Sequence, residues 1–180
     1  GERTPLIAFL GDSVTQGCFE LYVKDDGNIG TSFHQNNAYH KKIAEILSYL
    51  YPKCQINIIN AGISGDTAQG ALERLERDVL KFSPDLTVVC LGLNDSMLGK
   101  DNIDNYYSCL KEIFNRLKKS GSEVIFMTPN MMNTKVSCTL EKPVFISTAK
   151  KTMEIQNSGV FDGYIEKARQ AASECCVRIC

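Results

Sequence analysis

Short apolar runs alternate with longer amphipathic segments along most of this chain, and this alternation restricts its fold more than any other feature. Each run is too short for a helix and is flanked by turn residues, which is typical of a buried strand. The runs cover residues 6–10, 55–60, 86–91 and 124–127, and a fifth begins at 176–180. Strands that alternate with helices form a parallel sheet with helices on both faces.

The segments between these runs carry apolar residues at helical spacing. They predict helices at 38–50, 68–82, 103–117 and 160–175. Pro52 and Pro84 follow the first two helices, and Gly121 follows the third. We therefore predict an α/β fold of three layers, α/β/α, with a parallel, flavodoxin-like five-stranded sheet in the order 2-1-3-4-5 and right-handed crossovers.

Two stretches lack either pattern. Residues 23–37 are polar, with glycines at 27 and 30, and predict a surface loop. Residues 129–159 show little regular pattern, and irregular segments of this length are usually functional or disordered. Three interpretations of the second stretch are open: a lid, a dimer contact or a disordered segment.

Length and charge limit the kind of partner. The 180 residues, 43% hydrophobic and 23% charged, fit one domain, 1–180, with ordinary composition. A net charge of −1 argues against nucleic acid or an anionic membrane as the main partner. No apolar run approaches the roughly 20 residues that span a bilayer. A small molecule is the expected partner, and the oligomeric state is open.

The eight cysteines show no spacing typical of a metal site. None forms a CxxC pair, and no histidine stands near them at zinc-ligand spacing. We expect no metal and no cofactor, and mostly free thiols rather than a disulfide framework. Residues 1–5 lead directly into the first strand without the apolar segment of a signal peptide. These features favour a cytoplasmic location, with secretion after removal of a signal peptide as the alternative.

Three successive strands end in groups suited to one reaction. Ser13 follows the first strand, Gly65 the second and Asn94 the third. The predicted strand order brings these ends to one crevice, where open α/β sheets bind ligands. A serine hydroxyl is a nucleophile, whereas a Gly65 N–H uncrowded by a side chain and the Asn94 amide are donors for an oxyanion. This set is the one that acyl transfer requires.

The same segments carry a family resemblance. Gly-Asp-Ser at 11–13, Asn-Ala-Gly-Ile-Ser-Gly-Asp-Thr at 60–67 and Gly-Leu-Asn-Asp at 92–95 resemble the first three sequence blocks of the SGNH hydrolases, also called GDSL esterases and lipases. The resemblance implies Ser13 as nucleophile, with the N–H groups of Ser13 and Gly65 and the Asn94 side chain as oxyanion hole. Members hydrolyse esters or thioesters without a metal, and many deacetylate carbohydrates. Asp12 and Asp95 are expected to brace their loops, and Gly62 to serve backbone geometry.

The fourth landmark of that family is absent from this sequence. It is an Asp-x-x-His near the C-terminus that supplies the catalytic base, whereas the only histidines here are His34 and His40. His40, beside Lys41 and Lys42, is expected to be solvated, and His34 is an alternative base. The main expectation is a domain truncated at its C-terminal end, with very weak activity.

Two classes of function are therefore compared. The first is a serine esterase for small acyl esters, chiefly acetyl esters, with carbohydrates among the candidate alcohols. The alternative is a catalytically inactive binding domain that holds a sugar or an anionic ligand through backbone N–H groups. A flavodoxin-like redox module is disfavoured because no aromatic-rich flavin loop is apparent.

Overall fold

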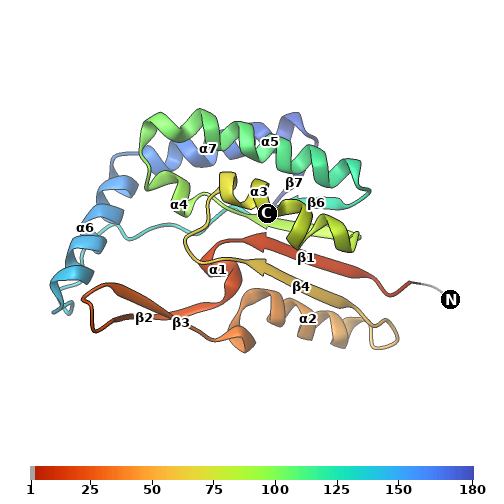
Figure 1. Ribbon diagram of the computed structural model, residues 1–180, viewed down its shortest axis with the longest axis horizontal. Coiled ribbons are helices and arrows are strands. Elements are labelled where there is room, and N and C mark those ends of the chain that lie inside the picture. Colours follow the sequence, from red (N-terminus) through yellow and green to blue (C-terminus); the bar gives the residue numbers. More distant parts are fainter. Residues whose placement is uncertain (1–2) are drawn as a thin grey trace.

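The computed structural model describes residues 3–180 and has the three predicted layers (Figure 1). Its five-stranded sheet has the order β4-β1-β5-β6-β7, with every neighbouring pair parallel. In chain order the strands are β1 (Leu6–Gly11), β4 (Asn57–Gly62), β5 (Leu86–Cys90), β6 (Glu123–Phe126) and β7 (Arg178–Ile179). This is the predicted order 2-1-3-4-5, so the fold prediction is confirmed.

Helices cover both faces of the sheet (Figure 1). One face carries α3 (Ala68–Asp78), α5 (Ile103–Lys119) and α7 (Val160–Glu174), and the other carries α2 (Tyr39–Leu50). The main core lies between the sheet and the first three helices, where Tyr106, Leu110, Ile113 and Leu117 of α5 are fully buried. Their spacing of three and four residues is the amphipathic pattern that predicted this helix.

Short helical turns follow the strands that matter for the site. β1 leads directly into α1 (Ser13–Gln16), and β5 leads into α4 (Leu93–Ser96). Gly92, with φ at +140°, turns the chain between β5 and α4. The remaining short elements are the 3-10 helices η1 (Gln35–Asn37), η2 (Leu80–Phe82) and η3 (Lys100–Asn102).

The prediction of a surface loop at 23–37 was wrong for residues 29–33, which form a strand. A hairpin of β2 (Cys18–Val23) and β3 (Ile29–Phe33) occupies this region as a separate two-stranded antiparallel sheet. Gly27, at φ +81°, lies in its turn. Phe19, Leu21 and Tyr22 of β2 are all exposed, so neither face is buried enough to give the alternation by which strands are recognised.

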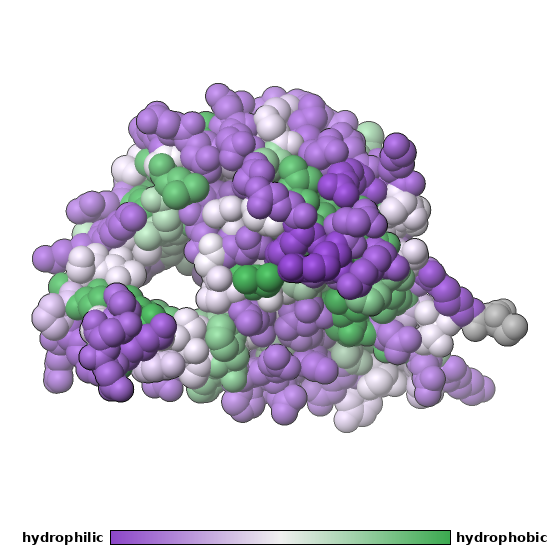
Figure 2. Space-filling model, viewed as in Figure 1, coloured by the Kyte–Doolittle hydropathy of each residue, from purple (hydrophilic) through white to green (hydrophobic). Residues whose placement is uncertain are grey.

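The prediction of an irregular segment at 129–159 was also wrong, because it contains the helix α6 (Pro143–Asn157). Pro143 stands at its start, where proline is favoured. α6 buries no residue, so no apolar stripe marked it in the sequence. We call the β2–β3 hairpin and α6 the arm; an opening separates the arm from the sheet layers (Figure 2).

Leu21 of the hairpin and α6 line a cleft of about 410 Å³ within the arm. Its wall is mainly apolar and includes Leu140, Phe145 and Ala149. Within residues 3–180, no helix is both long and apolar enough to cross a membrane.

Candidate active site

Ser13 is the first residue of α1, directly beyond β1. The Asp12 carboxylate caps this turn by accepting a hydrogen bond from the Val14 N–H at 2.9 Å. A Cβ at Gly11 would lie 2.6 Å from the Cys90 carbonyl oxygen, so glycine allows β1, β5 and α1 to pack closely here. Ser13 itself stays partly exposed and accessible to a substrate.

Gly65 lies in the exposed turn after β4. A Cβ there would meet no atom from elsewhere in the described chain within 4 Å. Glycine is favoured because φ is +80°, in the left-handed region. Crowding occurs instead at Gly62, where a Cβ would lie 2.7 Å from the Thr15 carbonyl carbon.

Asn94 lies in α4 and reaches across to the turn after β4. Its Nδ2 donates to the Asp66 carbonyl oxygen at 2.8 Å, and the distance from Nδ2 to Asp12 Oδ2 is 3.5 Å. An amide nitrogen has two hydrogens, and the first of these contacts uses one of them fully. The second hydrogen has only the long contact to Asp12, so it remains available to another acceptor.

Asp95 braces the neighbouring helix, as predicted. Its Oδ1 accepts a hydrogen bond from the Ala68 N–H at 3.0 Å, at the start of α3. Its Oδ2 is buried and has no partner among the described residues. Burial raises the pKa of Asp95 to about 6, and burial also raises the pKa of Asp12. Both carboxyls therefore favour the neutral form more than an exposed aspartate does.

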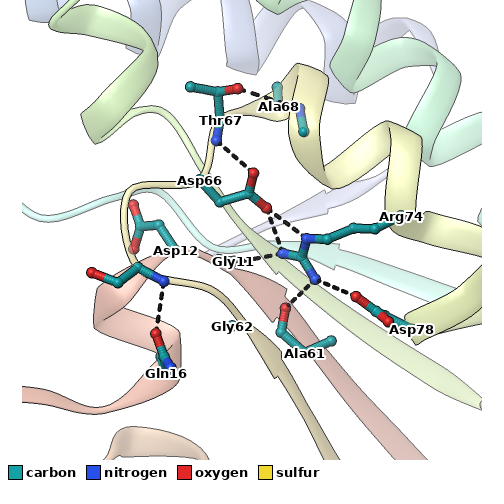
Figure 3. Close-up of polar contacts among 12 residues, drawn as sticks. Gly11, Asp12, Gln16, Ala61, Gly62, Asp66, Thr67, Ala68, Arg74 and Asp78 are labelled. Atoms are coloured by element: carbon teal, nitrogen blue, oxygen red, sulfur yellow. Dashed lines mark hydrogen bonds and ion pairs between the residues drawn. The ribbon is translucent and has the colours of Figure 1, made fainter. Parts of the chain in front are cut away.

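Sequence reasoning missed the role of Arg74, whose guanidinium lies beneath the strand ends (Figure 3). The side chain is 8% exposed and pairs with the carboxylates of Asp66 and Asp78. It also donates to the carbonyl oxygens of Ala61 and Gly11. The available signal was its position three residues after Ala71 and one before Leu75, on the face of α3 that is otherwise apolar.

His40 lies in α2, and His34 directly precedes η1. His40 is 1% exposed, with its ring centroid 5.8 Å from that of Phe9, so the prediction that it is solvated was wrong. α2 turns this residue toward the sheet, and burial lowers its pKa. His34 is exposed and packs against Phe19 of the hairpin at 5.4 Å between ring centroids. Neither ring has Ser13 among its partners in the described part of the chain.

All eight cysteines are free thiols in the structure. Cys90 ends β5 close to the site, but burial raises the pKa of its thiol to about 12. Because the thiolate is the reactive form, Cys90 does not compete with Ser13 as nucleophile near neutral pH. Ser13 and Asn94 thus lie in the turns after β1 and β5, and Asn94 is bonded to the turn that contains Gly65.

Comparisons with known proteins find relatives that are named as esterases. An acetylxylan esterase from Geobacillus stearothermophilus is 28% identical over an alignment of 132 residues that covers 68% of this chain and 58% of that protein. An arylesterase from Vibrio mimicus is 35% identical over 72 residues, 40% of this chain and 36% of that one. The chain thus spans less than two thirds of the length of either relative.

A solved structure of a lipase/acylhydrolase from Enterococcus faecalis has the same fold. Its TM-score is 0.71 at 18% sequence identity, over 98% of this chain and 75% of that one. The family model of GDSL-like lipases and acylhydrolases matches residues 9–178, nearly the whole chain. The resemblance carried by the three sequence blocks is confirmed, and the chain belongs to the GDSL-like lipase/acylhydrolase family.

Proposed function

We propose that this protein is a serine ester hydrolase that removes small acyl groups, chiefly acetyl, from alcohols that include carbohydrates. One observation carries the proposal. The structure places Ser13 and Asn94 in the helical turns after β1 and β5, and the Asn94 amide bonds at 2.8 Å to the turn that contains Gly65. A nucleophile and two separate oxyanion donors thus share one edge of the sheet.

In the proposed reaction, Ser13 Oγ attacks the ester carbonyl carbon while its proton passes to a general base. The carbonyl oxygen becomes an oxyanion and receives hydrogen bonds from the N–H groups of Ser13 and Gly65 and from Asn94 Nδ2. The tetrahedral intermediate then expels the alcohol, which takes up a proton. Water attacks the acyl-serine in the same way, releasing the carboxylic acid and restoring Ser13.

The substrate class rests on the relatives and on exposure of the site. The two curated relatives are named for acetylxylan and for aryl esters, which share an ester carbonyl but differ in the alcohol. Gly65 is exposed and Ser13 is partly exposed, so a bulky alcohol can extend into solvent from a small acyl group. An acetylated sugar is the proposed natural substrate on these grounds.

Hydrolysis of 4-nitrophenyl acetate by the 180-residue chain and by Ser13→Ala tests the proposal. Because no hydrogen bond joins either histidine ring to Ser13 among the described residues, we expect slow turnover, at the level that an oxyanion hole and binding sustain without a base, about 10³–10⁴ over water. Added imidazole should raise the Ser13-dependent part of the rate. Equal rates for the two proteins, with and without imidazole, would contradict the proposal and favour the inactive binding domain.

The variant His34→Ala tests whether His34 is the general base. We expect this variant to keep the Ser13-dependent rate, since His34 packs on the hairpin rather than on the serine. Loss of that rate in a folded His34→Ala would make His34 the base.

A further inference from the structure

We propose that Arg74 is a positioning residue for the oxyanion hole, and that it acts through Asp66. The inference rests on the proposed function, because it concerns how the donors of that site are held. Arg74 lies in α3 and is not one of the groups that would touch a substrate. Its guanidinium instead contacts the ends of β1 and β4 and the turn between β4 and α3 (Figure 3).

The contacts use the full fork of the guanidinium. Nε and Nη2 both lie close to Asp66 Oδ2, at 2.7 and 2.6 Å. Nη1 donates to the Ala61 carbonyl oxygen at 2.8 Å, and Nη2 donates to the Gly11 carbonyl oxygen at 3.1 Å. The two carbonyls belong to neighbouring strands, one residue from the end of β4 and at the end of β1. One side chain therefore ties the strand that leads to Ser13 to the strand that leads to Gly65.

The charge is compensated within the same cluster. Besides Asp66, the Asp78 carboxylate accepts from Nη1 at 3.1 Å, one helical turn further along α3. A buried guanidinium is stable only when its charge and donors are satisfied, as they are here. Lysine carries a single ammonium at the end of a flexible chain and cannot reproduce this planar arrangement of donors.

The link from Arg74 to the donors runs through Asp66. The Asp66 carboxylate binds Arg74, whereas its carbonyl oxygen accepts the Asn94 amide at 2.8 Å. Asp66 also directly follows Gly65 in the chain. Any shift of this residue therefore moves the Gly65 N–H and the partner of Asn94 together.

Hydrogen bonds also hold this turn: the Ser64 N–H donates to Gln16 Oε1 at 2.7 Å, and the Asp66 N–H donates to the Ile63 carbonyl oxygen at 3.1 Å. Gly65 is exposed, has φ +80° and has no atom within 4 Å of where a Cβ would stand. A glycine in that setting does not fix its own conformation by packing. The ion pair between Asp66 and Arg74 is a buried contact that joins this turn to the ends of β1 and β4, so its loss should change where the Gly65 N–H points.

The test compares Arg74→Lys with Arg77→Lys. Arg77 is a matched control, because it lies on the same helix and binds the same Asp78, but its side chain is 67% exposed and faces away from the strand ends. On 4-nitrophenyl acetate, with Ser13→Ala as the blank, we expect Arg74→Lys to lower kcat by about 10- to 100-fold. This is less than the 10²–10³ for loss of a donor, because the donors are misplaced rather than removed. KM should change less than about threefold, and Arg77→Lys should match the wild type.

A double variant separates positioning from a merely structural role. If Arg74 acts through the oxyanion donors, Arg74→Lys should slow an Asn94→Ala enzyme less than it slows the wild type, because only the Gly65 N–H is then left to be displaced. Equal fractional losses in both backgrounds, or an unchanged kcat in folded Arg74→Lys, would overturn the inference. Should Arg74→Lys fail to fold, Asp66→Asn weakens the same link and is scored by the same criteria.

A readout independent of turnover distinguishes failure of this inference from failure of the proposed function. The side-chain amide signals of Asn94 in a ¹⁵N NMR spectrum should shift in Arg74→Lys and stay in place in Arg77→Lys. If the wild type shows no Ser13-dependent hydrolysis, the proposed function fails, and the NMR result alone decides the positioning claim. Unshifted Asn94 signals in Arg74→Lys would overturn it.

Discussion

The strand ends and the arm are built in opposite ways, although both lie near the carboxyl edge of the sheet. At the strand ends, Asp12, Arg74 and Asp95 are almost completely buried and each has a defined partner. In the arm, α6 buries no residue and the hairpin exposes Phe19 and Leu21. The comparison shows that precise placement of polar groups depends on burial beneath the site, whereas the elements beside it are loosely packed.

The largest expected effect on stability comes from comparing Leu75→Ala with Leu21→Ala. Leu75 is fully buried under the strand ends, whereas Leu21 is 47% exposed in the arm. Loss of the buried side chain leaves a cavity and should lower the free energy of unfolding by about 2–5 kcal/mol. The exposed substitution should cost less than about 1 kcal/mol. Urea denaturation measures both, and equal losses would show that the arm is as tightly packed as the core.

Asp95 should make stability fall with rising pH. Its pKa of about 6 in the folded protein exceeds the 3.8 of an unperturbed aspartate. The folded state therefore binds more protons between these values, and the contribution is complete below about pH 4 and lost as the pH rises through 6. The free energy of unfolding of Asp95→Asn should therefore rise relative to that of the wild type when the pH is raised from 4 to 7.5. The expected rise is roughly 2–3 kcal/mol.

Asp104→Asn is the control for this pH effect, because the Asp104 side chain is 86% exposed. Urea denaturation at both pH values should show no comparable gain for it. A difference between Asp95→Asn and the wild type that does not change with pH would mean that the pKa of Asp95 is the same in the folded and the unfolded protein.

Two glycines with the same backbone angle provide the sharpest comparison. Gly65 at the strand ends and Gly27 in the hairpin have φ of +80° and +81°, and a Cβ at either position meets nothing within 4 Å. Alanine should therefore cost both positions about the same, roughly 1–2 kcal/mol. Only Gly65→Ala should also lower kcat on 4-nitrophenyl acetate. An equal loss of kcat at Gly27 would place the hairpin turn in the mechanism.

The sheet and its core could be predicted from the sequence because burial leaves a periodic signal. The apolar spacing of α5 and the short run of β5 both correspond to observed elements. The hairpin and α6 could not be predicted in this way, since an element that buries no face has no apolar pattern to recognise.

The sequence indicates the residues of the candidate site, but it does not indicate the buried residues around them. Ser13, Gly65 and Asn94 follow strands, and strand ends are visible in the sequence. Arg74 and His40 are polar types that are usually exposed, and only tertiary packing shows that they are buried. The need for glycine at 62 arises from close approach of β4 to α1, which is likewise a property of the assembled fold.

The central claim is that the ends of β1, β4 and β5 form an oxyanion hole, and Asn94→Ala tests it most directly. Steady-state hydrolysis of 4-nitrophenyl acetate should show kcat lowered by about 10²–10³, with KM changed less than about threefold, because the donor acts on charge that develops during the reaction. Asn105→Ala, on the surface of α5, is the control and should match the wild type. An unchanged kcat in folded Asn94→Ala would remove Asn94 from the mechanism and contradict the account.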